Sequence, residues 1–235
     1  TLSAPASLTT TSLDGAIALF WSDNAFEEDP QGFQAYRVYS APYDLDQDRC
    51  GDWALEGTTV APEFVSGALA NGVPRCFGVS AMTIEGFESL WSPIRDDTPR
   101  FESRNVALFP ADVDATQSSF RFWRDANGDG QVNDAELGIV TAATEATADF
   151  VVERGAGNDL RLGLVRAGTT AQQYGAGPIA DLTSIDVAPV GGYSTATLVV
   201  QPGFGYVFQM SGLAGDGFLR FGGVRVTHVG QAFLL

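Results

Sequence analysis

Residues 125–136, "DANGDGQVNDAE", place oxygen-bearing side chains at alternate positions of a short loop. Calcium takes six to eight oxygen ligands, which a twelve-residue loop supplies from positions one, three, five, seven, nine and twelve. Position six must turn sharply, and Gly130 stands there. The spacing therefore predicts a Ca2+ site. Its predicted ligands are Asp125, Asn127, Asp129, Gln131 through the backbone carbonyl, Asn133 and Glu136.

The residues before this loop, Ser118 to Trp123 ("SSFRFW"), alternate as a strand does. A calcium loop between two helices serves as a switch because the helices open on binding. A strand at the entrance favours a structural ion that braces one folded unit. The alternative is an acidic hairpin tip that binds no metal.

The composition limits the classes of partner. The chain of 235 residues carries 29 acidic residues against 13 basic ones, all arginine, for a net charge of −16. Such a chain repels nucleic acid phosphates and anionic lipid headgroups, so we expect neither as a partner. The absence of lysine excludes Schiff-base chemistry and a Walker-type phosphate loop. No apolar run is long enough to form a transmembrane segment.

Residues that could catalyse a reaction are scarce. The single histidine, His228, lies in an alternating run and is expected to be a structural strand residue. The sequence has no GxSxG elbow and no zinc-ligand spacing. Asp44, Asp46 and Asp48 also alternate, but Arg49 stands where a metal loop needs glycine, so a solvated loop is expected. We predict no catalytic residues, and a hydrolase with dispersed carboxylates remains an alternative.

The first hundred residues contain short alternating runs separated by turn chemistry. The runs at 16–21, 33–40 and 76–82 are typical of strands, and the segments 23–32 and 70–74 are typical of turns. This spacing predicts an all-β sandwich.

Residues 5–98 resemble a fibronectin type III domain of the bacterial extracellular kind. The resemblance is carried by Pro5, "ALFW" ending at Trp21, "YRVYS", "LANGVPRCFGVSA" and "GFESLWS". The tyrosine that the family places before strand F is replaced here by Arg75. The resemblance therefore implies that the hydrogen bond of this corner is replaced, with the neighbouring Cys76 as one candidate.

Cys50 and Cys76 are the only two cysteines. From the composition alone they form either a disulfide in an oxidising compartment or two buried thiols. In the fibronectin type III family the start of strand F lies near the connection that follows strand C, where Cys50 falls. The resemblance thus implies a Cys50–Cys76 disulfide, worth roughly 3 kcal/mol in the chain-entropy model.

The chain is predicted to contain two β domains. Residues 1–98 form the fibronectin type III-like domain, 99–104 a polar linker, and 105–235 a calcium-braced second β-sandwich or partly open barrel. A short helix is expected around residues 134–147. Residues 119–138 resemble EF-hand-like calcium loops in β-sandwich repeats of bacterial surface proteins, which implies a structural ion.

These features favour a non-catalytic, exported accessory subunit that docks onto other proteins of an envelope or surface assembly. We expect an extracytoplasmic location, with an export signal upstream of Thr1 and either no anchor or a lipid anchor outside this sequence. The alternative partner is a glycan, bound by a pair of modules through a row of coplanar tryptophans. For that alternative the candidates are Trp53, Trp91 and Trp123, although core or interface packing is the favoured role of each.

Overall fold

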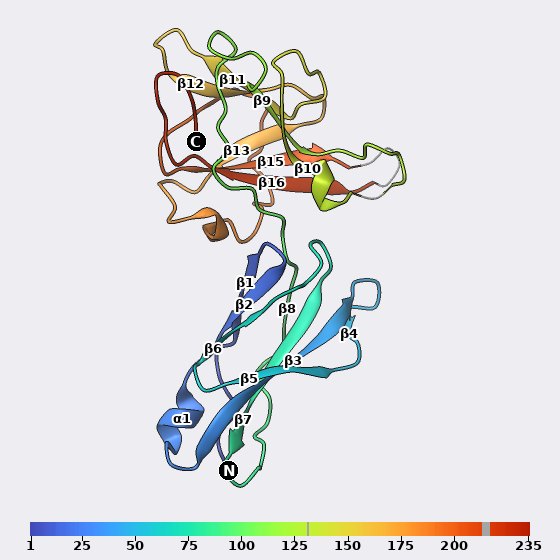
Figure 1. Cartoon of the computed structure of the whole chain (residues 1–235), viewed down its shortest axis with the longest axis vertical. Coiled ribbons are helices and arrows are strands. Elements are labelled where there is room, and N and C mark those ends of the chain that lie inside the picture. Colours follow the sequence, from blue (N-terminus) through green and yellow to red (C-terminus); the bar gives the residue numbers. More distant parts are fainter. Residues whose placement is uncertain (131, 213–216) are drawn as a thin grey trace. The chain divides into compact units, whose positions relative to one another are not determined.

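The computed structural model describes residues 1–130, 132–212 and 217–235, and its two compact units span Thr1–Glu102 and Ser103–Leu235 (Figure 1). The division falls within the predicted linker, residues 99–104. Both units are built from antiparallel strands, which confirms the all-β fold class. In the described ranges, no helix has the length and apolar character needed to cross a bilayer.

Unit 1 (Thr1–Glu102) contains two sheets. The first has the order β1-β2-β6 and the second the order β4-β3-β7-β8, with β5 paired to β3. The strands are β1 (Thr9–Leu13), β2 (Ala16–Phe20), β3 (Phe33–Asp44), β4 (Arg49–Cys50), β5 (Ala54–Thr59), β6 (Glu63–Ser66), β7 (Arg75–Thr83) and β8 (Arg95–Asp97).

Alternation along β3 explains how the core of unit 1 forms. Tyr36 and Val38 are buried between less buried neighbours, and they pack in one core cluster with Phe77 and Val79 of β7, a strand that is buried along most of its length. Trp21 closes this core and meets the Tyr36 ring edge-on at 5.3 Å. The three strand runs expected at 16–21, 33–40 and 76–82 are therefore confirmed.

The turn expected at residues 23–32 contains a short helix, α1 (Asn24–Glu28). Its Asn24 side chain bonds the backbone of Ala4 and Ala6, and Ala25 is buried. These tertiary contacts favour one helical turn in a segment whose composition is typical of loops.

The described residues of unit 2 (Ser103–Leu235) also form two sheets. One has the order β10-β9-β11-β12-β14 and the other the order β13-β15-β16. The strands are β9 (Ser119–Trp123), β10 (Leu137–Thr141), β11 (Phe150–Arg154), β12 (Leu160–Leu164), β13 (Thr170–Tyr174), β14 (Leu198–Val199), β15 (Gly205–Ser211) and β16 (Leu219–Arg225).

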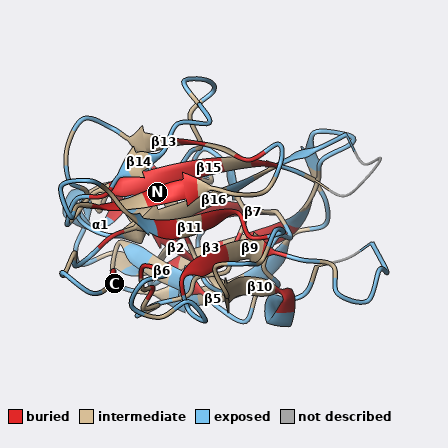
Figure 2. Cartoon of the chain, turned by 90° about the horizontal axis from the view of Figure 1, so that it is seen from above, coloured by how far each residue is buried: buried red, intermediate tan, exposed pale blue. Residues whose placement is uncertain are grey.

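Aromatic rings join the two sheets of unit 2. Phe150 on β11 stacks on Phe120 of β9 at 5.5 Å and on Phe208 of β15 at 4.9 Å. All three side chains are buried, and Figure 2 shows buried residues concentrated on such central strands. Unit 2 is therefore a two-sheet β-sandwich, the first of the two architectures expected for it.

Two sequence-based expectations for unit 2 are wrong. Residues 134–147 do not form a helix, because a single 3-10 turn, η1 (Asp134–Glu136), leads directly into β10. Gly138 has a left-handed φ of 63°, and β10 gains backbone hydrogen bonds by pairing with β9. His228 lies beyond the end of β16 and is exposed, with its ring 5.3 Å from Phe233.

Candidate functional site

The predicted calcium loop begins where β9 ends. Asp125 accepts hydrogen bonds through Oδ1 from the backbone N–H of Gly128 at 2.7 Å and of Asp129 at 3.2 Å, and through Oδ2 from Gly130 at 3.0 Å. Gly128 and Gly130 have φ values of 72° and 80°, which favour glycine. The first predicted ligand therefore organises the turn of the loop around its own carboxylate.

The last predicted ligand closes the loop. Glu136 is buried, and its Oε1 accepts the backbone N–H of Ala126 at 2.6 Å. Its Oε2 accepts Asn133 Nδ2 at 2.7 Å, while the backbone N–H of Arg124 bonds the Glu136 carbonyl at 2.9 Å. These bonds hold the end of the loop against its beginning.

Five of the six predicted ligands belong to the described residues, whereas Gln131 lies outside them. All five carry side-chain oxygen, the ligand type that calcium prefers. The three carboxylates are each hydrogen-bonded within the loop, Asp129 through Asn127 at 2.8 Å. Over the part of the chain that the structure describes, no three His, Cys, Asp or Glu side chains form a metal-binding group. The residues thus fit calcium in donor type and loop closure, and the metal site stays a prediction.

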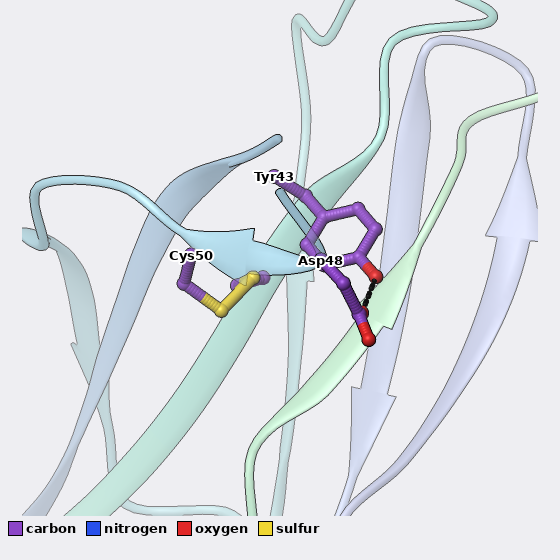
Figure 3. The surroundings of a disulfide bond; sticks show 4 residues. Tyr43, Asp48 and Cys50 are labelled. Atoms are coloured by element: carbon purple, nitrogen blue, oxygen red, sulfur yellow. Dashed lines mark hydrogen bonds between the residues drawn. A yellow bond between two sulfur atoms is a disulfide. The ribbon is translucent and has the colours of Figure 1, made fainter. Parts of the chain in front are cut away.

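Unit 1 contains the disulfide that the sequence predicts, between Cys50 on β4 and Cys76 on β7. Figure 3 shows it beside Tyr43 and Asp48, whose hydroxyl and carboxylate are hydrogen-bonded. That bond to the carboxylate raises the pKa of Tyr43 to about 12. A shallow hollow of about 420 Å³ lies here, lined by Pro42, Tyr43, Asp44, Arg49, Cys50, Gly51 and Asp52.

Unit 1 also contains a polar network that the sequence did not predict. Glu56 on β5 accepts the hydroxyls of Ser40 at 2.6 Å and of Ser66 at 2.7 Å, and both serines are buried. Arg75 Nη2 donates to the Ser40 hydroxyl at 2.6 Å. Burial acts to raise the pKa of Glu56, but the two hydroxyls and then Arg75 outweigh it, so that this pKa is lowered.

The outward side of the second sheet of unit 1 carries a row of stacked groups. The Arg37 guanidinium lies 5.6 Å from the centre of the Tyr39 ring, and Tyr39 stacks on Trp91 at 4.4 Å. Trp53 meets Trp91 edge-on at 4.9 Å and 85°. Gly78 lies beneath Trp91, since a Cβ there would come within 2.7 Å of the indole.

Glu88 fixes one end of this row. It accepts Tyr39 Oη at 2.7 Å and Arg37 Nη1 at 3.0 Å, and it also bonds Ser80. Burial acts to raise the pKa of Glu88, but Ser80, Tyr39 and Arg37 together lower it. The carboxylate therefore positions the row.

In unit 2 two arginines contact one tryptophan ring. The guanidinium of Arg220 lies 4.5 Å from the Trp123 ring centre, and that of Arg166 lies 5.1 Å from it. Arg166 also pairs at 2.8 Å with Asp149, a fully buried carboxylate. Burial raises the pKa of Asp149, and the hydrogen bond from the Phe122 N–H, the charge of Arg166 and the hydrogen bond from Thr169 only partly offset this rise.

No family model matches this chain, and no curated protein matches it. Solved structures similar to it include an Fn3-like protein from Clostridium thermocellum, at 20% identity and TM-score 0.33 over 43% of this chain and 98% of that one. Another is a human fibronectin type III domain, at 19% identity and TM-score 0.36 over 44% and 91%. A β-1,2-glucanase from Parabacteroides distasonis matches at 17% identity and TM-score 0.35 over 44% of this chain and 13% of that one.

The first two neighbours are fibronectin type III or Fn3-like domains, matched over about 43% of this chain. The first two are matched over nearly their whole length, whereas the chain spans only a small part of the glucanase. The chain is thus similar to β-domain modules, and no activity is inferred from TM-scores this low.

The tryptophans are not arranged as a row of coplanar exposed rings. Trp21 and Trp123 are buried, and Trp53 stands perpendicular to Trp91. Trp123 is a core residue of unit 2, whereas Trp53 and Trp91 are half-buried on the outward face of a sheet. The favoured expectation of core or interface packing agrees with these positions.

Two carboxylates with displaced pKa values, Glu56 and Asp149, form hydrogen bonds that connect neighbouring strands. Glu56 links β5 to β3 and β6, and Asp149 links the start of β11 to β9. Neither they nor Glu88 line the hollow beside the disulfide. The sequence missed these networks because each joins residues distant in the chain, although serines at inward-facing strand positions such as Ser40 and Ser66 signal a buried partner.

Proposed function

We propose that this chain is a non-catalytic, exported structural subunit that docks onto a larger envelope or surface assembly through its β-domain surfaces. The observation that carries the proposal is the exposure of large apolar side chains on or beside strands. Leu55 and Ile94 in unit 1 are 47% and 40% exposed. Leu219 and Phe221 on β16 of unit 2 are 57% and 46% exposed. Exposed large apolar side chains on or beside strands of each unit are candidates for interaction sites.

The bonding of the titratable groups supports a structural role. Glu56 and Asp149 are each bonded to groups on neighbouring strands, so burial and bonding between strands account for their displaced pKa values. Displaced pKa values also accompany catalysis, but ion-pair networks produce them equally well.

A structural calcium ion is part of the proposal. Asp125, Asn127, Asp129, Asn133 and Glu136 would hold it, together with the Gln131 carbonyl. An ion bound only by the folded form stabilises that form. In unit 2 its role would be to fix the hairpin of β9 and β10, whose connection is this loop.

An extracytoplasmic location is supported by the disulfide between Cys50 and Cys76, because disulfides persist in oxidising compartments. The net charge of −16 favours other proteins as partners over nucleic acid or anionic lipid, which it repels.

The test is fractionation of the source organism with an antibody against the chain. We expect the chain in the envelope or surface fraction, migrating with a complex much larger than 24.9 kDa. A chain carrying Leu55→Ser, Ile94→Ser and Phe221→Ser should leave that complex, whereas Val65→Ser should not. Migration of the wild type as a free monomer that hydrolyses a glycoside would overturn the proposal.

A further inference from the structure

The second sheet of unit 1 presents a defined outward surface, which we call the aromatic face. Its direction follows from register, because Tyr36 and Val38 point into the core, whereas Arg37 and Tyr39 point away from it. Tyr39 on β3 is paired with Leu55 on β5 and, on its other side, with Gly78 on β7. The face consists of Arg37, Tyr39, Trp53, Leu55, Trp91 and Ile94.

The disulfide belongs to the same face. Cys76 lies two residues before Gly78 on β7, so the two residues share the side of the strand opposite to Phe77, although Cys76 itself is fully buried. Cys50 precedes Trp53 by three residues, so the bond to Cys76 anchors the segment that carries Trp53. The crosslink therefore fixes Trp53 where it meets Trp91.

The ring arrangement disfavours sugar stacking. A sugar needs the open face of an aromatic ring, but Trp91 has Tyr39 stacked on it and Trp53 set perpendicular to it. The Tyr39 ring is also covered by the Arg37 guanidinium. The groups still accessible to a partner are the ring edges and the aliphatic side chains of Leu55 and Ile94. Such a surface is suited to contact with apolar side chains of another protein.

The charge around the face selects a cationic partner. Unit 1 holds sixteen Asp and Glu against five Arg, a net charge of −11. Asp52 is exposed next to Trp53, and the exposed Asp96 is paired on β8 with Cys76 of the disulfide. The contact of Arg37 with Tyr39 shows that this face accommodates a guanidinium against an aromatic ring.

We propose that the aromatic face binds a basic, apolar segment of a partner protein, and that the Cys50–Cys76 disulfide completes the face by holding Trp53. This inference rests on the proposed function and names the surface and the partner chemistry within it. The partner inserts aliphatic side chains beside Leu55 and Ile94 and places arginine or lysine against Asp52 and Asp96.

The test uses the whole chain and three probes: a blocked hexapeptide of alternating arginine and leucine, its glutamate–leucine counterpart, and cellohexaose. Binding is followed through the indole N–H signals of Trp53 and Trp91, with the buried Trp21 and Trp123 as internal references. We expect saturable shifts of the first two signals with the arginine peptide alone, weakened by salt. Leu55→Ser with Ile94→Ser should weaken binding by about tenfold or more, the scale of an interface hot spot.

Val65→Ser is the matched control, because Val65 is 59% exposed on β6 of the other sheet and should leave binding unchanged. Cys50→Ser with Cys76→Ser should abolish binding, and Trp53→Ala should reproduce the loss with the disulfide intact. Equal binding of the glutamate peptide, shifts with cellohexaose only, or no loss in these variants would overturn the inference. If the arginine–leucine peptide does not bind while the native complex is retained, the proposed function stands and only the assignment of the aromatic face as the binding surface is wrong.

Discussion

Arg75 donates a 2.6 Å hydrogen bond to the hydroxyl of Ser40, linking the start of β7 to β3. The sequence resemblance to fibronectin type III domains predicts a tyrosine at this position, and the structure shows that Arg75 bonds Ser40 there. The Ser40 hydroxyl in turn donates to Glu56, and Glu56 also accepts a hydrogen bond from Ser66 on β6. The bond between Arg75 and Ser40 is thus part of a network that joins both sheets of unit 1.

Replacing Glu56 by glutamine should destabilise unit 1 by about 1–3 kcal/mol, the cost of leaving buried polar groups without partners. The amide offers only one acceptor atom for the two serine hydroxyls. Urea unfolding of the whole chain measures the change, and Glu63→Gln, at an exposed position on β6, is the control. Equal midpoints for the two variants would contradict this role of Glu56.

The stabilisation by Glu56 should depend on pH. Because its folded-state pKa is lowered, the contribution is present above the unfolded-state pKa, about 4.3, and is lost as pH falls through the folded pKa. The difference in free energy of unfolding between wild type and Glu56→Gln should therefore shrink as pH falls below about 4. A difference that stays constant or grows in acid would assign the effect to packing.

Asp149 should show the opposite dependence. Its folded-state pKa is raised, mainly by burial, so its protonated form favours folding. The stability that it contributes is fully present below the unfolded-state pKa, about 3.9, and is lost as pH rises through the folded pKa. Comparison of wild type with Asp149→Asn across this range isolates the effect from other carboxylates. A difference that increases with pH would show that the Arg166 ion pair dominates instead.

The strands of unit 1 were predictable because burial on one side imposes alternation, as at Tyr36 and Val38. The network around Glu56 was not predictable. Ser40 and Ser66 reach Glu56 only because of the register in which β5 pairs with β3, and this register shifts beside Val38. Likewise, the segment after Asn133 has a helix-starting capping box, yet β10 forms there because pairing with β9 supplies bonds that no local pattern encodes. The twelve-residue loop was visible in sequence because all its predicted ligands are local.

Removing the disulfide by Cys50→Ser and Cys76→Ser should lower the stability of unit 1 by about 3 kcal/mol in the chain-entropy model, since the loop spans 26 residues. Calorimetry of the whole chain should show an earlier transition for unit 1 and an unchanged one for unit 2. Reductant should shift the wild type in the same direction and leave the double variant unaffected. A shift of both transitions would contradict a local role.

Gly78→Ala should disturb the aromatic face. The added Cβ would lie 2.7 Å from Trp91 Cε3 and 2.9 Å from Ile94 Cδ1, so the indole must move. We expect a loss of about 1–3 kcal/mol, typical of overpacking, and a weaker far-UV exciton band from the Trp53–Trp91 pair. Gly67→Ala is the control, because a Cβ there meets nothing within 4 Å. An unchanged exciton band in Gly78→Ala would show that Trp91 does not rest on this glycine.

Calcium should raise the melting temperature of unit 2 and leave that of unit 1 unchanged. At a free concentration one hundred times the dissociation constant, a single site adds about 2.7 kcal/mol of stability. Asp125→Asn with Glu136→Gln should remove this increment, because it replaces the carboxylates at both ends of the loop. Glu136 also bonds Ala126 and Asn133, so this variant should be less stable even without calcium, and the calcium-induced increment is the quantity to compare. Asp46→Asn, in the acidic loop of unit 1, should retain the full increment. A wild-type melting curve that chelator and calcium leave unchanged would identify residues 125–136 as an acidic hairpin tip whose hydrogen bonds alone hold its shape.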